Sequence, residues 1–135
     1  MRTPVKTISP EAGLDRALVM MRTQRIRHLP VVEDGALVGL ITDRDLRFSM
    51  VEMEGPDKQP KGLYLPALTK VRAVMKTELI TAAPEDELPA RTRQMADRKI
   101  GCLPVLETGT TKLVGIVTET DLLKYLARLL EEKEA

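Results

Sequence analysis

The sequence has few of the residues that build covalent or metal-bound frameworks. It contains one cysteine, Cys102, one histidine, His28, and no tryptophan. A lone cysteine forms neither an internal disulfide nor a paired-cysteine zinc site, and this usage is typical of a reducing compartment. Aromatic residues make up only 2% of the chain, so the core must consist mainly of aliphatic side chains and methionine. No metal site is predicted.

A large net charge and a long apolar run are also missing. Lysine and arginine total 21 against 20 acidic residues, a formal net charge of +1, so no global field attracts nucleic acid or a membrane surface. No apolar run approaches the roughly 18 residues of a membrane span. The start, Met1-Arg2-Thr3-Pro4, lacks the apolar stretch of a secretion signal. We therefore expect a cytoplasmic protein that does not associate with membranes.

What the sequence does have is an internal repeat. Residues 25–32 return as residues 99–106, with Pro104 74 positions after Pro30. Residues 37–46 return as residues 113–122, with Asp121 76 positions after Asp45, because the intervening turn is longer in the second copy. A chain of 135 residues is too short for two independent cores, so the two copies are expected to share one.

Both copies predict a strand and then a helix. An extended piece, residues 5–9 in the first copy and residues 79–82 in the second, is followed by a proline and acids, which favours a helix start. The first helix carries an apolar stripe at helical spacing, made of Leu14, Ala17, Leu18 and Met21. In the second copy, Arg91 and Thr92 interrupt this stripe.

Two strands and a last helix complete each copy. Continuous apolar character predicts strands buried on both faces, at residues 29–32 and 37–41 and again at residues 103–106 and 113–117. A helix then starts after Thr42 or Thr118. The apolar faces of these helices are Leu46, Met50 and Met53 in the first copy, and Leu122, Leu126, Leu129 and Leu130 in the second. One chain cannot bury both faces, so a homodimer is expected.

Residues 51–70 break the repeat. Glycines and prolines lie there among charged residues, which is typical of a linker, and Tyr64 and Leu65 are the residues that could pin it to the surface. The first repeat is therefore placed at residues 3–50, the linker at residues 51–70 and the second repeat at residues 71–130.

A Thr-x-x-Asp motif, Thr42 with Asp45 and Thr118 with Asp121, opens the last helix of each copy. Threonine at a helix start with an acid three positions later forms a capping box, which stabilises a helix by roughly 1 kcal/mol. A helix start also offers backbone N–H groups to a phosphate, and a carboxylate there can accept hydrogen bonds from ribose. Because both copies place the motif identically after a buried strand, we favour ligand binding together with capping.

The two copies resemble the CBS-domain pair, or Bateman module. The resemblance is carried by residues 26–32 with 38–46 and by residues 100–106 with 114–122. Within this family the sequence is most similar to AcuB-like acetoin-utilisation proteins, which pair an Arg-His-Leu-Pro repeat with a Gly-Cys-Leu-Pro repeat; their frequent ACT domain does not follow here. The resemblance implies an α/β fold of two tandem CBS repeats, β-α-β-β-α each, packed as one pseudo-two-fold module.

The resemblance also implies a regulatory ligand. Such modules bind adenine-containing molecules, AMP, ADP, ATP or S-adenosylmethionine, in two clefts between the repeats, and the resemblance points to no other cofactor. Carried over, Thr42, Asp45, Thr118 and Asp121 face phosphate and ribose. Adenine is expected against Thr7, Ile8, Arg27 and His28 in one cleft and against Thr81, Ala82, Gly101 and Cys102 in the other.

His28 and Cys102 occupy matching positions in the two copies. A thiol where the other copy has an imidazole argues that neither group is required for catalysis, and no nucleophile accompanies His28 in its motif. His28 either contacts the ligand or packs, and Cys102 is expected to be a small buried hydrophobic residue. We predict a regulatory protein that is not an enzyme and whose regulated partner is a further protein or its own dimer.

An arginine-rich edge leaves a second function open. Near the first Thr-Asp motif lie Arg22, Arg25, Arg27, Arg44 and Arg47. They form a solvated basic face, or Arg27 and Arg44 bind phosphate. Gly101 and Thr120 replace these two in the second copy, so the first cleft should prefer the more anionic ligand. The alternative, a nucleic-acid-binding protein that uses this edge, is disfavoured by the near-neutral charge and by three scattered aromatic residues.

Overall fold

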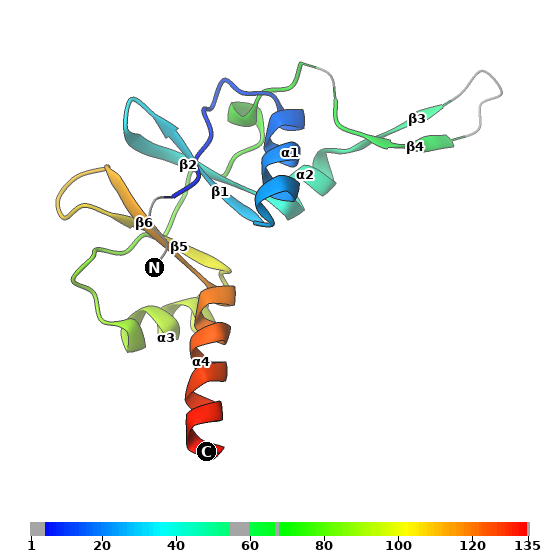
Figure 1. Cartoon of the computed structure of the whole chain (residues 1–135). Coiled ribbons are helices and arrows are strands. Elements are labelled where there is room, and N and C mark those ends of the chain that lie inside the picture. Colours follow the sequence, from blue (N-terminus) through cyan, green and yellow to red (C-terminus); the bar gives the residue numbers. More distant parts are fainter. Residues whose placement is uncertain (1–4, 55–59, 67, 135) are drawn as a thin grey trace. The chain divides into compact units, whose positions relative to one another are not determined.

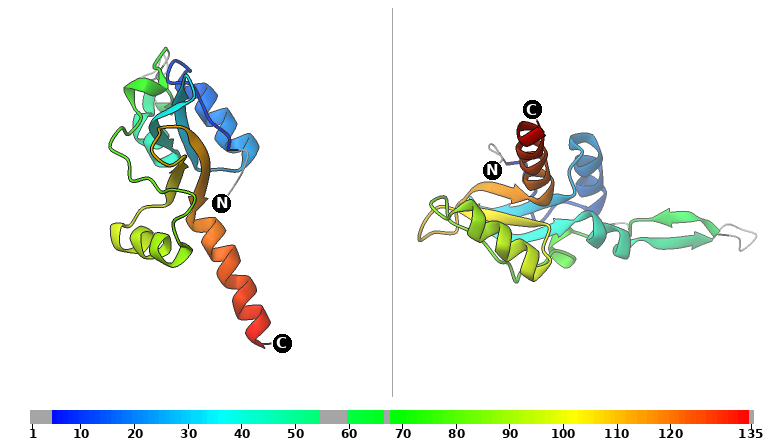
Figure 2. Two further views of the ribbon diagram at one scale, coloured as in Figure 1. Left: turned by 90° about the vertical axis from the view of Figure 1, so that its left-hand side faces the viewer. Right: turned by 90° about the horizontal axis from the view of Figure 1, so that it is seen from below.

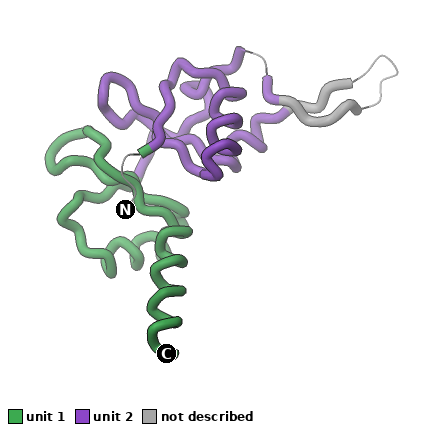
Figure 3. The backbone as a smooth tube through the Cα atoms, viewed as in Figure 1, with its two compact units in different colours: residues 1–5, 80–135 green, residues 6–79 purple. Residues whose placement is uncertain are grey.

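The structure, a computed structural model, describes residues 5–54, 60–66 and 68–134, with side chains for residues 5–50, 65, 66 and 68–134 (Figure 1). The chain divides into two compact units: unit 2 spans residues 6–79, and unit 1 comprises residues 80–135 with residues 1–5 (Figure 3). The buried side chains form two clusters, one in each unit. Each unit therefore has a buried cluster of its own.

Unit 2 contains the first copy and the residues that follow it. Its elements are α1 (Leu14–Gln24), β1 (His28–Glu33), β2 (Ala36–Thr42), α2 (Asp43–Ser49), β3 (Val51–Glu54), β4 (Pro60–Tyr64) and the 3-10 turn η1 (Val71–Ala73). β1 and β2 form an antiparallel hairpin, α1 packs on β1, and α2 continues directly from β2 (Figure 1). The turn of the hairpin is tight because Gly35, at φ 81°, takes a left-handed conformation.

Unit 1 repeats this plan. Its elements are α3 (Leu88–Arg98), β5 (Cys102–Leu106), β6 (Leu113–Thr118) and α4 (Glu119–Glu134). The β5–β6 hairpin copies β1–β2 in detail, because the register shifts between Val105 and Leu106 as it does between Val31 and Val32. Both predicted hairpins are thus confirmed, each about one residue longer at its ends than expected.

The predicted extended pieces shrink to single backbone bridges. Ile8 pairs in parallel with Val31, and Ala82 pairs with Val105 in the same way. Each residue donates from its amide to a proline carbonyl in the neighbouring strand, Pro30 or Pro104. Proline has no amide hydrogen, but its carbonyl remains available, so it is tolerated at this place in the sheet.

The core of each unit follows the predicted stripe. In unit 2, Leu14, Ala17 and Met21 of α1 are at most 5% exposed and pack against Leu29 and Val31. The neighbouring strand residues are buried in succession, as expected for a strand covered on both faces. In unit 1 the corresponding positions include Met95, Leu103 and Val105.

The helix after Thr42 is shorter than predicted. The apolar stripe of Leu46, Met50 and Met53 is wrong, because α2 ends at Ser49, Met50 has extended backbone angles, and Met53 lies in β3. The Ser49 hydroxyl donates to the Asp45 carbonyl, a local bond that competes with continued helix. The predicted linker also contains regular structure, since β3 and β4 pair antiparallel. Leu65 packs against the unit 2 core, whereas the Tyr64 side chain lies outside the described residues.

α4 is the least supported helix. None of its residues is buried, and Leu123, Leu126, Leu129 and Leu130 are 45–63% exposed. Its C-terminal half extends beyond α3 and the β5–β6 hairpin of the same unit (Figures 1 and 2). The wide apolar face predicted for this helix is confirmed, whereas Leu46, the expected counterpart on α2, is fully buried in the unit 2 core.

Both α1 and α3 end at a residue with left-handed backbone angles, Arg25 and Lys99, each at φ 54°. Glycine avoids the strain of a β-carbon in this conformation. We therefore expect Lys99→Gly to stabilise the protein by about 0.5–1 kcal/mol, measured by urea denaturation. The neighbouring Arg98→Gly change, inside the helix, should instead destabilise it by about 1 kcal/mol. A loss of stability in Lys99→Gly would contradict this account of the helix end.

Candidate functional site

The first Thr-Asp motif closes the start of α2 as a capping box. The Thr42 amide donates to Asp45 Oδ2 at 2.9 Å, and the Asp45 amide donates to Thr42 Oγ1 at 3.2 Å. The Asp45 side chain is only 13% exposed. The structural role weighed for this motif is therefore confirmed, and the partly buried carboxylate remains accessible from one side.

The second motif has the same geometry. The Thr118 amide donates to Asp121 Oδ2 at 3.2 Å, and the Asp121 amide donates to Thr118 Oγ1 at the same distance. In addition, the Thr118 hydroxyl donates to Asp121 Oδ2 at 2.9 Å. The internal repeat thus reproduces a polar constellation down to individual hydrogen bonds.

In each unit, the start of the first hairpin strand lies next to the Thr-Asp cap of the following helix. The Asp43 amide donates to the Arg27 carbonyl at 3.0 Å, and the Glu119 amide donates to the Gly101 carbonyl at 2.9 Å. His28 lies opposite Thr42 in the strand register, and Cys102 lies opposite Thr118. Sequence positions 27–28 and 42–45 therefore converge, as do positions 101–102 and 118–121.

These contacts change what each helix start offers to a ligand. The amides of Asp43 and Asp45 already donate within unit 2, and those of Glu119 and Asp121 donate within unit 1. A phosphate therefore does not find the set of free amides that the helix-start argument assumed. The groups that each helix start leaves for a ligand are the threonine hydroxyl, the carboxylate and any nearby cation.

One such cation was missed by the sequence reasoning. Lys76 Nζ lies 3.7 Å from Asp45 Oδ1, and the Lys76 side chain is more than half exposed. Its backbone pairs with Leu40 of β2 through two hydrogen bonds of 2.8 and 2.9 Å. The repeat contains the signal for it, since Met75-Lys76-Thr77 lies 74 positions after Met1-Arg2-Thr3. Lys76 therefore belongs to the start of the second copy but serves the motif of the first.

Gly39 makes room for this lysine. A β-carbon on Gly39 would stand 2.6 Å from Met75 Sδ and 3.0 Å from the Lys76 carbonyl oxygen. Real β-carbons do not approach sulfur or oxygen this closely, so the segment at residues 75–76 can lie against β2 only where the strand carries glycine.

Four predicted adenine contacts lie beside these constellations rather than in them. Ile8 is 4% exposed and Ala82 is 7% exposed, and both belong to the cores. Their amides and carbonyls are also bonded to the neighbouring strands. Thr7 is half-buried and Thr81 is exposed. Ligand contact by these residues stays a prediction, and of the four only Thr7 and Thr81 have side chains in reach of solvent.

The two predicted arginines lie in different places. Arg27 is exposed and lines a groove of about 480 Å³ between α1 and α2, together with Arg22, Arg25 and Arg47. The Arg44 guanidinium lies instead over the Phe48 ring, 5.3 Å from its centroid. The arginine-rich edge is therefore mostly the rim of this groove, and the structure does not bring Arg44 to it.

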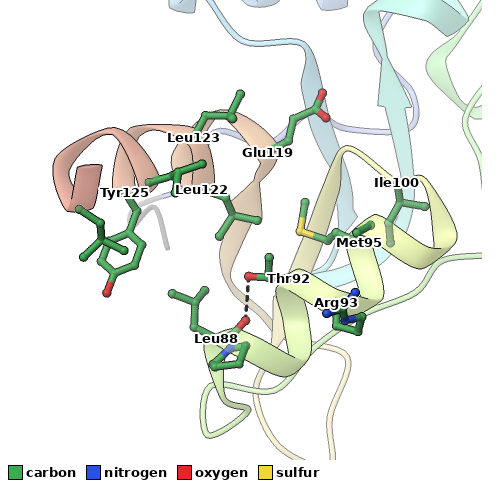
Figure 4. Close-up of a pocket in the computed structure, with 13 residues that line it drawn as sticks. Leu88, Thr92, Arg93, Met95, Ile100, Glu119, Leu122, Leu123 and Tyr125 are labelled. Atoms are coloured by element: carbon green, nitrogen blue, oxygen red, sulfur yellow. Dashed lines mark hydrogen bonds between the residues drawn. The ribbon is translucent and has the colours of Figure 1, made fainter. Parts of the chain in front are cut away.

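A larger groove of about 750 Å³ lies between α3 and α4. Figure 4 shows leucines from both helices, Leu88, Leu122 and Leu123, around an apolar space that Met95 and Ile100 also line. Many of its residues correspond to residues that line the α1–α2 groove, but among the described residues its lining contains one arginine, Arg93, where the α1–α2 groove has four. Arg47 of α2 corresponds to Leu123 of α4.

Cys102 is buried, as predicted, and His28 is half-buried. Among the described residues, no group of three or more histidine, cysteine or acidic side chains could hold a metal ion. No described helix is long and apolar enough to cross a membrane.

The duplicated hairpin, flanking helices and Thr-Asp caps define a class of protein, the tandem CBS-domain modules. A sequence model of the CBS domain matches residues 1–52 and 71–128, which leaves out only the β3–β4 region and the chain end. The chain belongs to the CBS domain family, and modules of this class bind regulatory ligands.

Individual relatives agree with this assignment. A CBS domain-containing protein of Dictyostelium discoideum is 36% identical over 126 residues, which cover 93% of this chain and 86% of that protein. The crystal structure of an AcuB protein from Vibrio cholerae matches with a TM-score of 0.78 at 30% identity, over 99% of this chain and 91% of that one. The CBS pair of protein MJ0100, solved with 5′-methylthioadenosine and S-adenosyl-L-methionine, shares the fold at 23% identity and a TM-score of 0.75, over 94% of this chain and 91% of that one.

Proposed function

We propose that this protein is a non-enzymatic regulatory module that binds an adenine-containing ligand, AMP, ADP, ATP or S-adenosylmethionine, at its two Thr-Asp motifs. The observation that carries the proposal is the duplicated constellation, in which Asp45 and Asp121 are partly buried, oriented by a threonine and placed beside the start of a buried strand. Capping requires only the helix, whereas the matching residues of β1 and β5 add a second wall to each site.

Each group has a chemical task in this proposal. The Asp45 carboxylate accepts hydrogen bonds from ribose hydroxyls, and Thr42 donates to a phosphate oxygen while it still caps α2. Lys76 gives up its 3.7 Å contact with Asp45 and makes a charge-assisted hydrogen bond to the phosphate. His28 and Thr7 offer the adenine one aromatic and one hydroxyl contact. Asp121 does the same work in the second site, next to Gly101, Cys102 and Thr81, and Thr118 donates to phosphate once its hydroxyl leaves Asp121.

Two observations support an adenosine-based ligand without catalysis. The CBS pair of MJ0100 binds two adenosine derivatives, one neutral at its sulfur and one cationic. In this chain, the histidine and the cysteine occupy equivalent places in the two sites, so the shared constellation includes no imidazole and no thiol common to both. A site built from a cap, a carboxylate and a cation can hold a nucleotide and needs no reactive group.

A thermal-shift screen tests this function. A ligand that binds only the folded protein raises the melting temperature, by the equivalent of about 2.7 kcal/mol at 100 times its Kd. We expect a rise with at least one of AMP, ADP, ATP and S-adenosylmethionine, and none with the matched guanine or cytosine nucleotides. Equal shifts with all nucleotides would indicate phosphate binding alone, and no shift with any adenine compound would overturn the proposal.

We further propose that the functional form is a homodimer that covers the exposed leucines of α4. Light scattering at micromolar concentration should give twice the mass of the chain. Leu126→Glu places a charge in the apolar groove and should give a monomer, because an unpaired carboxylate in a buried interface is strongly unfavourable. Val19→Glu, at an exposed apolar position on α1 that lines neither groove, should remain dimeric. A monomeric mass for the unmodified protein would refute the dimer.

A further inference from the structure

Unit 2 holds a segment of its own chain, which leads into the 3-10 turn η1, against the start of α1. This self-segment, residues 69–72, accepts a hydrogen bond from the Leu14 amide at the Thr69 carbonyl, at 3.1 Å. The Val71 amide donates to the Ala12 carbonyl at 2.8 Å. The Val71 side chain is fully buried in the same cluster as Leu14 and Ala17. The self-segment therefore completes the unit 2 core and satisfies the backbone ahead of the helix.

Ion pairs fix the self-segment on both sides of Val71. Lys70 Nζ lies 2.6 Å from Glu11 Oε2, and Arg72 bonds both to Glu11 at 2.9 Å and to Glu33 at 2.6 Å. The hydrogen bond from Lys70, with a further one from Arg72, holds the pKa of Glu11 below its ordinary value. Unit 2 thus holds a basic, apolar, basic sequence at the start of the 3-10 turn η1.

Unit 1 carries the equivalent surface at the start of α3, and no described residue occupies it as residues 69–72 occupy the surface in unit 2. We call this surface the α3-start site, and it consists of residues 84–88 and Glu107. These residues lie 74 positions after residues 10–14 and Glu33 of unit 2. In unit 2, Pro10 is buried and Leu14 is 1% exposed. In unit 1, the corresponding Pro84 is exposed and Leu88 is 38% exposed. Leu88 also borders the α3–α4 groove. Among the described residues, none hydrogen-bonds to the carbonyls of residues 84 and 86 or to the Leu88 amide.

The two carboxylates that pair with Lys70 and Arg72 in unit 2 have counterparts in the α3-start site. Glu11 corresponds to Glu85 and Glu33 to Glu107. Glu85 accepts a hydrogen bond from the Thr108 hydroxyl at 2.7 Å, and Glu107 accepts one from Thr110 at 3.4 Å. Within the described part of the chain, neither forms an ion pair, although the corresponding acids of unit 2 form three between them. The α3-start site therefore has the charge to attract a basic segment.

An unsatisfied buried cation marks the same helix. Arg91, at the position of Ala17, is only 7% exposed, and its Nε and Nη2 atoms are buried without a hydrogen-bond partner in the described structure. Burying the donors of a guanidinium unpaired is costly. In unit 2 the residue at this position packs in one cluster with Val71 of the self-segment. Peptide carbonyls of a segment docked in unit 1 are suitable acceptors for Arg91.

We propose that the α3-start site of unit 1 binds a basic segment of a partner polypeptide, with an apolar residue between two basic ones, as unit 2 binds Lys70-Val71-Arg72. The incoming backbone pairs with residues 84–88, its apolar side chain covers Leu88, and its basic side chains pair with Glu85 and Glu107. This inference does not depend on the adenine ligand. It gives the regulatory module a surface through which a second protein is held.

The chain itself supplies the probe for a test. A fluorescent peptide of residues 68–75 should bind the full-length protein in fluorescence anisotropy at low salt, with amide NMR shifts at residues 84–91. The double variant Glu85→Gln/Glu107→Gln should weaken binding by about threefold or more, because two exposed ion pairs are lost. Glu131→Gln/Glu132→Gln, with the same charge change on exposed α4, should leave the affinity unchanged. A peptide with glutamine in place of Lys70 and Arg72 should bind as weakly as the double variant binds the unmodified peptide.

Several results would overturn the proposal. The first is absence of binding at millimolar peptide, and the second is an affinity that does not change in the Glu85→Gln/Glu107→Gln variant. The third is a set of NMR shifts confined to residues 10–17, which would mean that the peptide exchanges with the self-segment of unit 2. A wild-type dimer that becomes monomeric in the Glu85→Gln/Glu107→Gln variant would assign the α3-start site to a second copy of this chain instead. Circular dichroism of each variant establishes that it is folded before binding is compared.

Discussion

Asp45→Ala is expected to weaken ATP binding by roughly tenfold or more and to do so more than Asp121→Ala. A charge-assisted hydrogen bond in a partly buried site contributes about 1.5 to 3 kcal/mol. The first site is also the more cationic. Asp43 is paired with Arg47 at 3.3 Å and Asp45 lies near Lys76, whereas in the second motif Glu119 has no ion pair among the described residues and Leu123 replaces Arg47.

The comparison of the two alanine variants controls for helix capping. Each removes one capping carboxylate, with an expected cost to stability of about 1 kcal/mol, so a difference between them reports on the ligand. Calorimetry with ATP and with adenosine separates phosphate from nucleoside recognition. Equal losses of ATP affinity, or a larger loss in Asp121→Ala, would show that the two sites are not ordered in this way.

Gly39→Val is expected to destabilise the protein by about 2–3 kcal/mol. The new side chain collides with Met75 and with the backbone at Lys76, and overpacking of this kind typically costs 1–3 kcal/mol. To relieve the clash, the segment at residues 75–76 must leave β2, and Lys76 then moves away from Asp45. The variant should therefore lose ATP affinity as well as stability, both measurable by thermal unfolding with and without ATP.

Ala36→Val provides the control for Gly39→Val. It adds the same type of side chain to the same strand at its half-buried first residue, where β-branched residues are favoured, so little change is expected. If Gly39→Val melts like the Ala36→Val protein, the close approach of residues 75–76 to β2 does not exist in solution.

Much of the fold could be predicted because it is encoded locally and written twice. The α1 stripe of Leu14, Ala17 and Met21 became the buried face, and both hairpins formed where continuous apolar runs flank a glycine turn. The Thr-Asp caps followed from residue type and spacing alone. Repetition helped because one copy supported the interpretation of the other, even where Arg91 weakened the second stripe.

What could not be predicted depends on contacts between residues far apart in sequence. Lys76 reaches Asp45 from beyond the linker, and only strand pairing with Leu40 places it there. α2 ended early because the chain after Ser49 pairs with residues 60–64 rather than continuing the apolar stripe. Arg44 was predicted to bind phosphate because it follows the helix cap in sequence. In the structure its guanidinium lies over the ring of Phe48 instead.

The most direct test of the central claim is calorimetric titration of the unmodified protein and of an Asp45→Ala/Asp121→Ala double variant with AMP, ATP and S-adenosylmethionine. The variant must first be shown to be folded by circular dichroism, because it lacks both capping carboxylates. We predict saturable binding of at least one of these ligands to the unmodified protein and loss of that binding in the double variant. Unchanged binding in the double variant, or no binding of any of the three to the unmodified protein, would contradict an adenine-ligand site at the duplicated Thr-Asp motifs.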